Sequence, residues 1–367
     1  MTEDIYRKLQ EHFHQYPIGY PATKSGVEIA LLKKMFEKEE AEIALAMTPK
    51  PESPEEIALR LRYDPKELAQ KLYAMSRRGL IMRRKEGDKV RFHLEPYVHG
   101  MDEYMLRQVF IGKRDKEFIN LDNQYQNEAF GAEFFRSKTS YFRIIPVEEN
   151  MPTESVILPH QKISEYIEKA EGIAVLDCIC RTRAKMLGKG CSHTVQNCFA
   201  FSPVAEFSIE NGWPGRMIGK EEALEILAQT EEEGLVHMLQ NAATGPWVMC
   251  NCCSCSCGVL RVVKNYKRHG CVSRSYYFAK MDEELCVGCE SCIDRCHFGA
   301  LSMKEGIAQV NEDYCMGCGL CVSTCSTGAI SLIRKPGELL VSPPPDLETL
   351  YAQIGKEKGR TEAIVGK

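Results

Sequence analysis

Two cysteine-rich runs near the end of the chain constrain it more than any other feature. Each run has the spacing C-x2-C-x2-C-x3-C, and the two runs are Cys286, Cys289, Cys292, Cys296 and Cys315, Cys318, Cys321, Cys325. A shift of 29 residues carries the first run onto the second, and it also carries Gly299 onto Gly328 and Ala300 onto Ala329. The runs are therefore an internal duplication and not a coincidence of composition.

The distribution of cysteine favours metal binding over disulfide bonding. All 18 cysteines lie at or after Cys178, and the chain begins with the charged segment MTEDIYRKLQ, where a secretory signal would need an apolar run. No stretch approaches the roughly 18 apolar residues of a membrane span. We therefore expect a cytoplasmic protein, whose thiols the cytosol keeps reduced. The formal net charge of -4 gives no global basic field for nucleic acid or a membrane.

Residues 1–96 are predicted to form a helical domain that ends in a hairpin. Apolar residues recur at helical spacing, and Ser53 and Asp64 each stand before a proline as a helix cap. Two short alternating runs then flank the turn Glu86, Gly87, Asp88, which indicates a hairpin. Three helices followed by a hairpin resemble the winged helix-turn-helix domains, and the resemblance covers about residues 25–95.

That resemblance implies a third helix in the major groove and a wing against phosphate. Residues 76–91 carry seven basic and two acidic side chains, a balance suited to phosphate. The alternatives are a protein-docking module and a solvated basic hairpin, because fold does not fix function. DNA is the less favoured partner, and an affinity for duplex DNA that falls steeply with salt would support it.

Residues 97–275 are predicted to form a cysteine-rich α/β middle domain that begins with connector helices over 97–150. The aromatic residues of the connector have no catalytic spacing, and we interpret them as core. The middle cysteines are Cys178, Cys180, Cys191, Cys198, Cys250, Cys252, Cys253, Cys255, Cys257 and Cys271. A strand would place Cys178 and Cys180 on one face, and an extended run would turn Cys250 and Cys252 away from the three cysteines that follow.

Ten middle cysteines could supply two four-thiolate sites with two thiols to spare. We favour one or more iron–sulfur clusters, with a structural zinc site as the main alternative and a reactive thiol or disulfide pair as the third. The dense stretch at 250–257 either lies between two sites or wraps around one cluster. His193 is left outside the predicted ligand set, because a lone histidine is more often a structural or surface residue.

The segments LCVGCESCIDRC and YCMGCGLCVSTC resemble the two-cluster bacterial ferredoxins, and residues 276–335 are predicted to form this domain. The resemblance implies that the fourth cysteine of each run binds the other cluster. One 4Fe–4S cluster would be held by Cys286, Cys289, Cys292 and Cys325, and the second by Cys315, Cys318, Cys321 and Cys296. His297 and Ser326 replace the usual proline, which removes no ligand but frees an amide that could bond to cluster sulfur. A zinc ribbon is the disfavoured alternative for this block.

Taken as a whole, the sequence predicts an α+β multidomain protein with a C-terminal tail over 336–367. We expect an iron–sulfur electron-transfer protein with two 4Fe–4S clusters and at least one further metal centre. It would act with a redox protein partner or as a subunit of an anaerobic oxidoreductase, and its domain order resembles multi-domain 4Fe–4S proteins of anaerobes. The alternatives are a redox-responsive DNA-binding regulator and an oxidoreductase whose middle cluster has an open iron.

Overall fold

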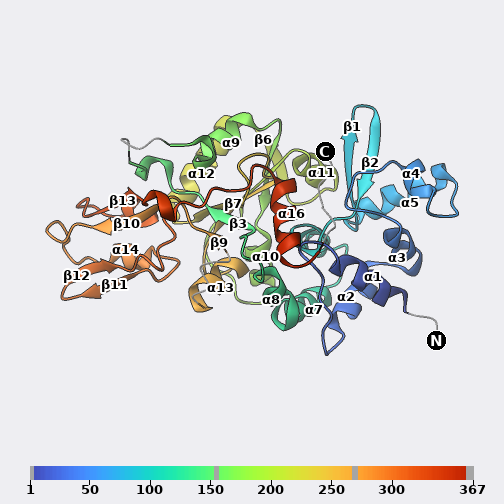
Figure 1. Cartoon of the computed structure of the whole chain (residues 1–367), viewed down its shortest axis with the longest axis horizontal. Helices are drawn as coiled ribbons and strands as arrows, with labels where there is room; N and C mark the ends of the chain where they lie inside the picture. Colours follow the sequence, from blue (N-terminus) through green and yellow to red (C-terminus); the bar gives the residue numbers. More distant parts are fainter. Residues whose placement is uncertain (1–3, 153–156, 267–271, 361–367) are drawn as a thin grey trace. The chain divides into compact units, whose positions relative to one another are not determined.

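The computed structural model describes residues 4–152, 157–266 and 272–360, and the chain divides into two compact units (Figure 1). The first unit contains Met1–Thr139, Glu206–Pro214 and Glu348–Lys367, and the second contains Ser140–Ala205 and Gly215–Leu347. Every cysteine belongs to the second unit, although Cys271 lies outside the described residues. In the described part of the chain, no helix has the length and apolar character that a membrane crossing needs.

The first unit is mainly helical. Its helices are α1 (Ile5–His14), α2 (Val27–Met35), α3 (Lys38–Leu45), α4 (Pro54–Ala58), α5 (Pro65–Arg77), α6 (Asp102–Phe110), α7 (Glu117–Tyr125) and α8 (Gly131–Phe134), with α11 (Val204–Glu210) and α16 (Leu347–Glu357) beginning at its boundaries. Strands β1 (Met82–Glu86) and β2 (Lys89–His93) form an antiparallel hairpin. Phe118, Tyr125 and Phe130 are buried, as predicted for the connector.

Side-chain caps begin the two helices that precede the hairpin. The Ser53 hydroxyl accepts a hydrogen bond from the Glu56 backbone N–H, and the Glu56 carboxylate accepts one from the Ser53 N–H. Asp64 accepts hydrogen bonds from two backbone N–H groups in the first turn of α5. The predicted helices and hairpin are therefore present, whereas membership of the winged-helix family stays a prediction.

The second unit combines a large sheet with a smaller cysteine-rich part. Its strands are β3 (Phe142–Ile144), β4 (Ile173–Asp177), β5 (Gln196–Phe201), β6 (Gly215–Ile218), β7 (Val236–Gln240), β8 (Val248–Cys252), β9 (Val272–Ser273), β10 (Tyr277–Met281), β11 (Leu301–Lys304), β12 (Ile307–Val310) and β13 (Ile330–Arg334). Its helices are α9 (Ile163–Lys169), α10 (Ile179–Met186), α12 (Lys220–Glu232), α13 (Gly258–Tyr266), α14 (Ser291–Asp294) and α15 (Leu320–Ser323). Seven strands form one sheet in the order β6-β4-β5-β8-β7-β3-β9, in which only the β3–β9 pair is parallel.

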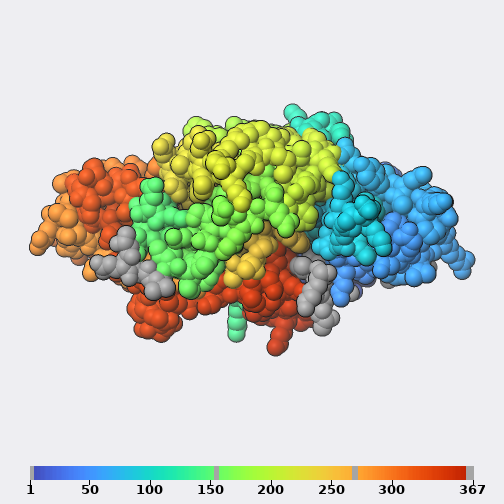
Figure 2. All heavy atoms as spheres, turned by 90° about the horizontal axis from the view of Figure 1, so that it is seen from above, coloured from blue at the N-terminus to red at the C-terminus, as the bar shows by residue number. Residues whose placement is uncertain are grey.

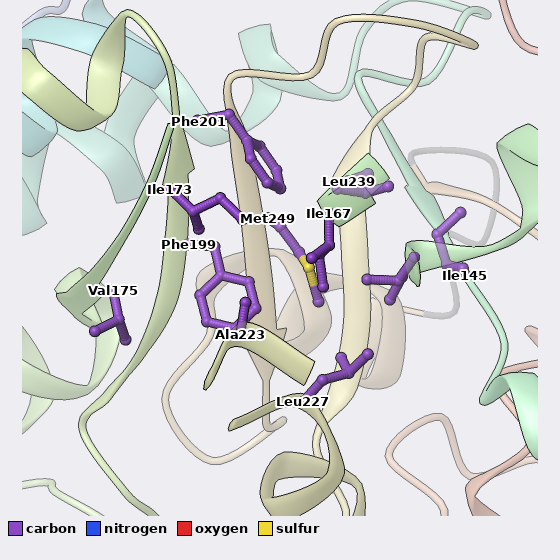
Figure 3. Close-up of a cluster of buried hydrophobic side chains, with 11 residues drawn as sticks. Ile145, Ile167, Ile173, Val175, Phe199, Phe201, Ala223, Leu227, Leu239 and Met249 are labelled. Atoms are coloured by element: carbon purple, nitrogen blue, oxygen red, sulfur yellow. The ribbon is translucent and has the colours of Figure 1, made fainter. Parts of the chain in front are cut away.

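One face of this sheet carries the hydrophobic core of the unit. Phe199 from β5 and Met249 from β8 are buried against Ile167 of α9 and Leu227 of α12 (Figure 3). Each large apolar side chain buried in this way contributes about 1.5–3 kcal/mol. Because side chains alternate along a strand, filling this face with apolar groups turns the intervening residues of β5 and β8 to the opposite face.

The duplicated cysteine runs fold into two matching halves. Strand β10 pairs antiparallel with β13, and β11 pairs antiparallel with β12. Helices α14 and α15 occupy equivalent positions of the repeat, 291–294 and 320–323. Each half therefore supplies one strand to each hairpin-like pair. In the space-filling view, the orange residues of this part gather beside green residues of the same unit (Figure 2).

Helix α12 offers a matched test of the core. Leu227 is 7% exposed and belongs to the core cluster, whereas Leu224 on the same helix is 42% exposed. We expect Leu227→Ala to lower the free energy of unfolding by about 2–5 kcal/mol, because it leaves a cavity beneath the sheet. Leu224→Ala should change it by about 0.5 kcal/mol or less. Anaerobic urea unfolding followed by far-UV circular dichroism measures both, and equal effects would contradict the packing described.

Candidate metal centres

The face of the sheet opposite the core presents a group of thiols. Phe199 pairs with Met249 across β5 and β8, and both point towards the core. Their neighbours Cys198 and Cys250 therefore lie side by side on the opposite face. Cys252, two residues beyond Cys250 at the end of β8, shares that face. The alternation predicted for Cys250 and Cys252 is thus present in the structure.

Cys178 and Cys180 reach the same group from a helix. The prediction that a strand presents both is wrong, because β4 ends at Asp177 and Cys178 is already the N-cap of α10. Cys180 lies in the first turn of that helix and contacts the thiol of Cys257, while Cys178 contacts Cys198. The apolar run before Cys178 does form a strand, as predicted, but this strand ends at Asp177, one residue before the first cysteine.

These thiols form one linked set, which we call the six-thiol group. Its members are Cys178, Cys180, Cys198, Cys250, Cys252 and Cys257. Thiol–thiol hydrogen bonds connect them in the order Cys178, Cys198, Cys250, Cys252, Cys257, Cys180. Every described cysteine of the chain is a free thiol.

Two members of the six-thiol group are stabilised as thiolates. Hydrogen bonds from Cys198 and Cys252 lower the pKa of Cys250 to about 6. Cys257 stands just before α13, and hydrogen bonds from Cys180 and Cys252, together with backbone N–H groups of the helix, hold its pKa well below the usual range. Thiolates are the form that binds metal, so the group has the chemistry of a metal site.

A second set lies on the loop between β8 and α13 and on the loop before β5. We call it the tetrahedral group, and its members are Cys191, His193, Cys253 and Cys255. Their ligand atoms all lie within 4.8 Å of one another, and the Sγ atoms of Cys191 and Cys253 are 3.8 Å apart. Burial raises the pKa of Cys191, but hydrogen bonds from Ser256 and His193 outweigh it and bring the value to about 6.

The tetrahedral group corrects two expectations about ligands. His193 was excluded from the predicted set, yet its ring lies among three thiols. Cys257 was predicted to share a face with Cys253 and Cys255, yet it joins the six-thiol group because a turn follows β8. The stretch 250–257 contributes thiols to both sets, with Cys250, Cys252 and Cys257 in one and Cys253 and Cys255 in the other. The spacing C-x-H at 191–193 was the signal for the histidine.

Arg181 of α10 lies between the two sets of thiols. Its side chain is 1% exposed, and its guanidinium donates hydrogen bonds to Thr194 O at 2.8 Å, Asn197 Oδ1 at 2.7 Å and Asn251 O at 2.6 Å. No carboxylate pairs with it among the described residues. Burial lowers the pKa of Arg181, but the thiols of Cys178, Cys198 and Cys253 outweigh burial and raise it. Among its described neighbours, the thiols are the groups that can carry a compensating negative charge.

Four cysteines of the duplicated block line one cavity. Cys286, Cys289, Cys292 and Cys325 surround about 330 Å³ of atom-free space beside α14. Three of these residues come from the first run, and the fourth comes from the end of the second run. Cys289 is exposed and Cys292 is buried, so one side of this cavity faces solvent.

The other four cysteines of the block form a more buried set. Burial raises the pKa of Cys321 well above the usual range, and the neighbouring charges of Cys318, Cys315 and Cys296 add to the effect. Backbone N–H groups point at sulfur in this set, from Ala279 to Cys315 Sγ and from Ala300 to Cys296 Sγ, both at 3.3 Å. Such N–H donors stabilise thiolate charge, which fits a set of cluster ligands.

The glycine before the second cysteine of each run allows the chain to turn closely. Gly288 and Gly317 have φ of 68° and 70°. A Cβ on Gly317 would lie 2.1 Å from Tyr277 O, and one on Gly288 would lie 2.4 Å from Gly306 O. A side chain at either position would force the cysteine loop away from the strands.

His297 connects the duplicated block to the tetrahedral group. Its Nε2 donates to Gly234 O at 2.7 Å, and its Nδ1 accepts from the Ser254 backbone N–H at 3.2 Å. Ser254 stands between Cys253 and Cys255 in the sequence. The residue that replaces the usual proline thus contributes a side-chain contact.

A family model described as a 4Fe-4S dicluster domain matches residues 279–332. The matched segment contains both cysteine runs and strands β11 and β12. The searches of curated proteins and of solved structures gave no match. The C-terminal part of the second unit is thus a ferredoxin-type domain, which confirms the iron–sulfur prediction for this region.

The basic hairpin of the first unit is largely paired with acidic residues. Five of the seven basic side chains form ion pairs within the unit: Arg78, Arg83, Arg84, Lys85 and Arg91. Glu210 alone contacts both Arg83 and Lys85. These pairs reduce the positive field that the hairpin offers to phosphate.

Arg181 provides a test of the link between the two sets of thiols. We expect Arg181→Lys to lower the free energy of unfolding by about 2–4 kcal/mol, because an ammonium cannot satisfy three separated acceptors that a guanidinium fork reaches. Arg216→Lys is the control, since Arg216 forms an exposed ion pair with Glu222 in the same unit. Anaerobic urea unfolding followed by visible cluster absorbance measures both variants. Equal stabilities would show that the Arg181 contacts contribute little.

Proposed function

We propose that the chain is an iron–sulfur electron-transfer protein in which the two cysteine runs exchange their fourth ligand. The cavity lined by Cys286, Cys289, Cys292 and Cys325 carries this proposal, because it joins three cysteines of one run with the last cysteine of the other. The dicluster family match over 279–332 supports the same chemistry. A 4Fe–4S cluster with four protein thiolates exchanges single electrons and offers no open iron to a substrate.

The two cysteine sets of the ferredoxin-type domain differ in solvent exposure, and this difference suggests which set exchanges electrons with a partner protein. Cys289 faces solvent, and the flanking Leu285 and Val287 are 48% and 69% exposed. Cys315 and Cys321 are buried, and Cys296 of the same set precedes His297, which contacts Ser254 beside the tetrahedral group. We infer that a redox protein docks on the Leu285–Val287 side and that the buried set faces the middle region.

The six-thiol group is the proposed third centre. It offers more thiols than a single cluster requires, and Cys250 and Cys257 already have lowered pKa values. Arg181 supplies a fixed positive charge beside Cys178 and Cys198, which offsets the negative charge of a cluster with thiolate ligands. The protein would then serve a larger redox enzyme as a subunit or partner, with its middle region carrying the electron path beyond the ferredoxin-type domain.

Serine variants test the exchange of ligands between the runs. We expect Cys286→Ser and Cys325→Ser to lose the same 4Fe–4S EPR signal, because both residues line one cavity. Cys315→Ser and Cys296→Ser should lose the other signal. Low-temperature EPR and iron content of anaerobically purified protein measure the effect. If Cys296→Ser instead reproduced the spectrum of Cys286→Ser, each run would hold its own cluster and the proposed exchange would be wrong.

Two valines of equal exposure test the docking side. Val287 and Val341 are both 69% exposed in the second unit, but only Val287 lies beside Cys286 and Cys289. We expect Val287→Glu to slow electron exchange with a reduced acidic ferredoxin by roughly three- to tenfold at low salt, because it adds like charge at the contact. Val341→Glu should leave the rate unchanged. Stopped-flow absorbance measures the rates, and a redox titration checks that the potentials are equal; equal rates would place docking elsewhere.

A further inference from the structure

We propose that the tetrahedral group binds one zinc ion and forms a site separate from every iron–sulfur centre of the chain. The ligands are the Sγ atoms of Cys191, Cys253 and Cys255 and one ring nitrogen of His193. This assignment is independent of the proposed electron-transfer function, because it uses none of the cysteines of the ferredoxin-type domain or of the six-thiol group.

The spacing of the ligand atoms fits a single ion. Zn²⁺ binds thiolate at about 2.3 Å, and tetrahedral geometry then places two sulfurs about 3.8 Å apart. The Sγ atoms of Cys191 and Cys253 are 3.8 Å apart, and all four ligand atoms lie within 4.8 Å of one another. The four cysteines of a 4Fe–4S cluster each bind a different iron, so their Sγ atoms must lie farther apart than the ligands of a single ion. No other group of described residues reaches this closeness, including the ferredoxin-type cysteines.

The donor set and its surroundings also fit zinc. Three thiolates with one imidazole form a common structural zinc site, closed to further ligands. The Nδ1 atom of His193 is buried and lacks a hydrogen-bond partner in the described part of the chain. An unpartnered buried nitrogen is costly, and a metal bound through Nδ1 would remove that cost.

The charge of the site is balanced by a neighbouring residue. Three thiolates and one Zn²⁺ leave a net charge of about -1 on the site. The Arg181 guanidinium hydrogen-bonds to Cys253 and is buried without a carboxylate partner among the described residues. The cation and the anionic site therefore compensate each other's burial.

The ligands join two loops that are distant in sequence. Cys191 and His193 follow α10, whereas Cys253 and Cys255 lie in the turn after β8. Ser254 within that turn donates its N–H to His297 of the ferredoxin-type domain. A zinc ion here would fix the conformation of the turn. Through the Ser254 N–H, it would also fix the position of the His297 ring. The role assigned to the metal is thus structural.

Metal analysis of the full chain, purified anaerobically, tests the site. We expect about one zinc per chain in addition to iron. Cys255→Ser and His193→Ala should lose the zinc and retain both 4Fe–4S EPR signals, whereas the matched control Cys286→Ser should lose iron and retain zinc. Co²⁺ in place of zinc should give the ligand-field bands of a tetrahedral site with thiolate charge-transfer absorption. His193→Cys should keep the metal as a four-cysteine site.

Three outcomes would overturn the proposal. The first is protein with its full iron content and no stoichiometric zinc. The second is loss of iron, with zinc unchanged, in Cys255→Ser. The third is loss of zinc from His193→Cys, which retains four soft ligands and therefore remains informative if the alanine and serine variants fail to fold. The Cys286→Ser control separates these results from a failure of the electron-transfer proposal, since that variant alters only the ferredoxin-type domain.

Discussion

The buried guanidinium of Arg181, which has no carboxylate partner among the described residues, is the constraint on which the middle region depends. An unpaired guanidinium in the interior costs several kcal/mol, so the fold must supply negative charge beside Arg181. Its described neighbours supply carbonyl and amide oxygens for its hydrogen bonds, but only cysteine can supply the charge. Thiolates held by a bound metal would supply that charge. Metal binding at the proposed middle centres would therefore favour the folded state through this side chain.

The ferredoxin-type domain was predictable because its information is local and repeated. Cysteine spacing, the 29-residue shift and the turn glycines lie within two short segments, so no long-range register had to be known. The middle cysteines depend instead on strand ends and on pairing between β5 and β8. The alternation of side chains along a strand could place Cys250 and Cys253 on opposite faces. It could not show that β4 ends before Cys178, or that the turn after β8 returns Cys257 to the six-thiol group. His193 was missed for the same reason, because two of its three partners, Cys253 and Cys255, are distant in sequence.

The basic hairpin shows a different limit of the sequence. Counting charges over residues 76–91 gave a surplus suited to phosphate, and the count itself is correct. The acidic partners come from segments outside that window, including Glu40, Glu56 and Glu210. Only the fold brings these carboxylates next to the basic side chains. The resulting ion pairs within the unit neutralise much of the positive charge that would otherwise attract the phosphates of DNA. The positive field of the hairpin is therefore weaker than the local composition indicates.

The replacement of proline by histidine after Cys296 relates the duplicated block to the rest of the second unit. A proline in this position could not make these contacts, because its ring nitrogen is a backbone amide that neither accepts from Ser254 nor donates to Gly234 O. At the equivalent position of the other run stands Ser326, whose side chain has no ring nitrogen. Both runs lack the usual proline, and the histidine stands in the run whose end contacts the turn of the tetrahedral group. His297 in this way connects the end of the first cysteine run to the turn that carries Cys253 and Cys255.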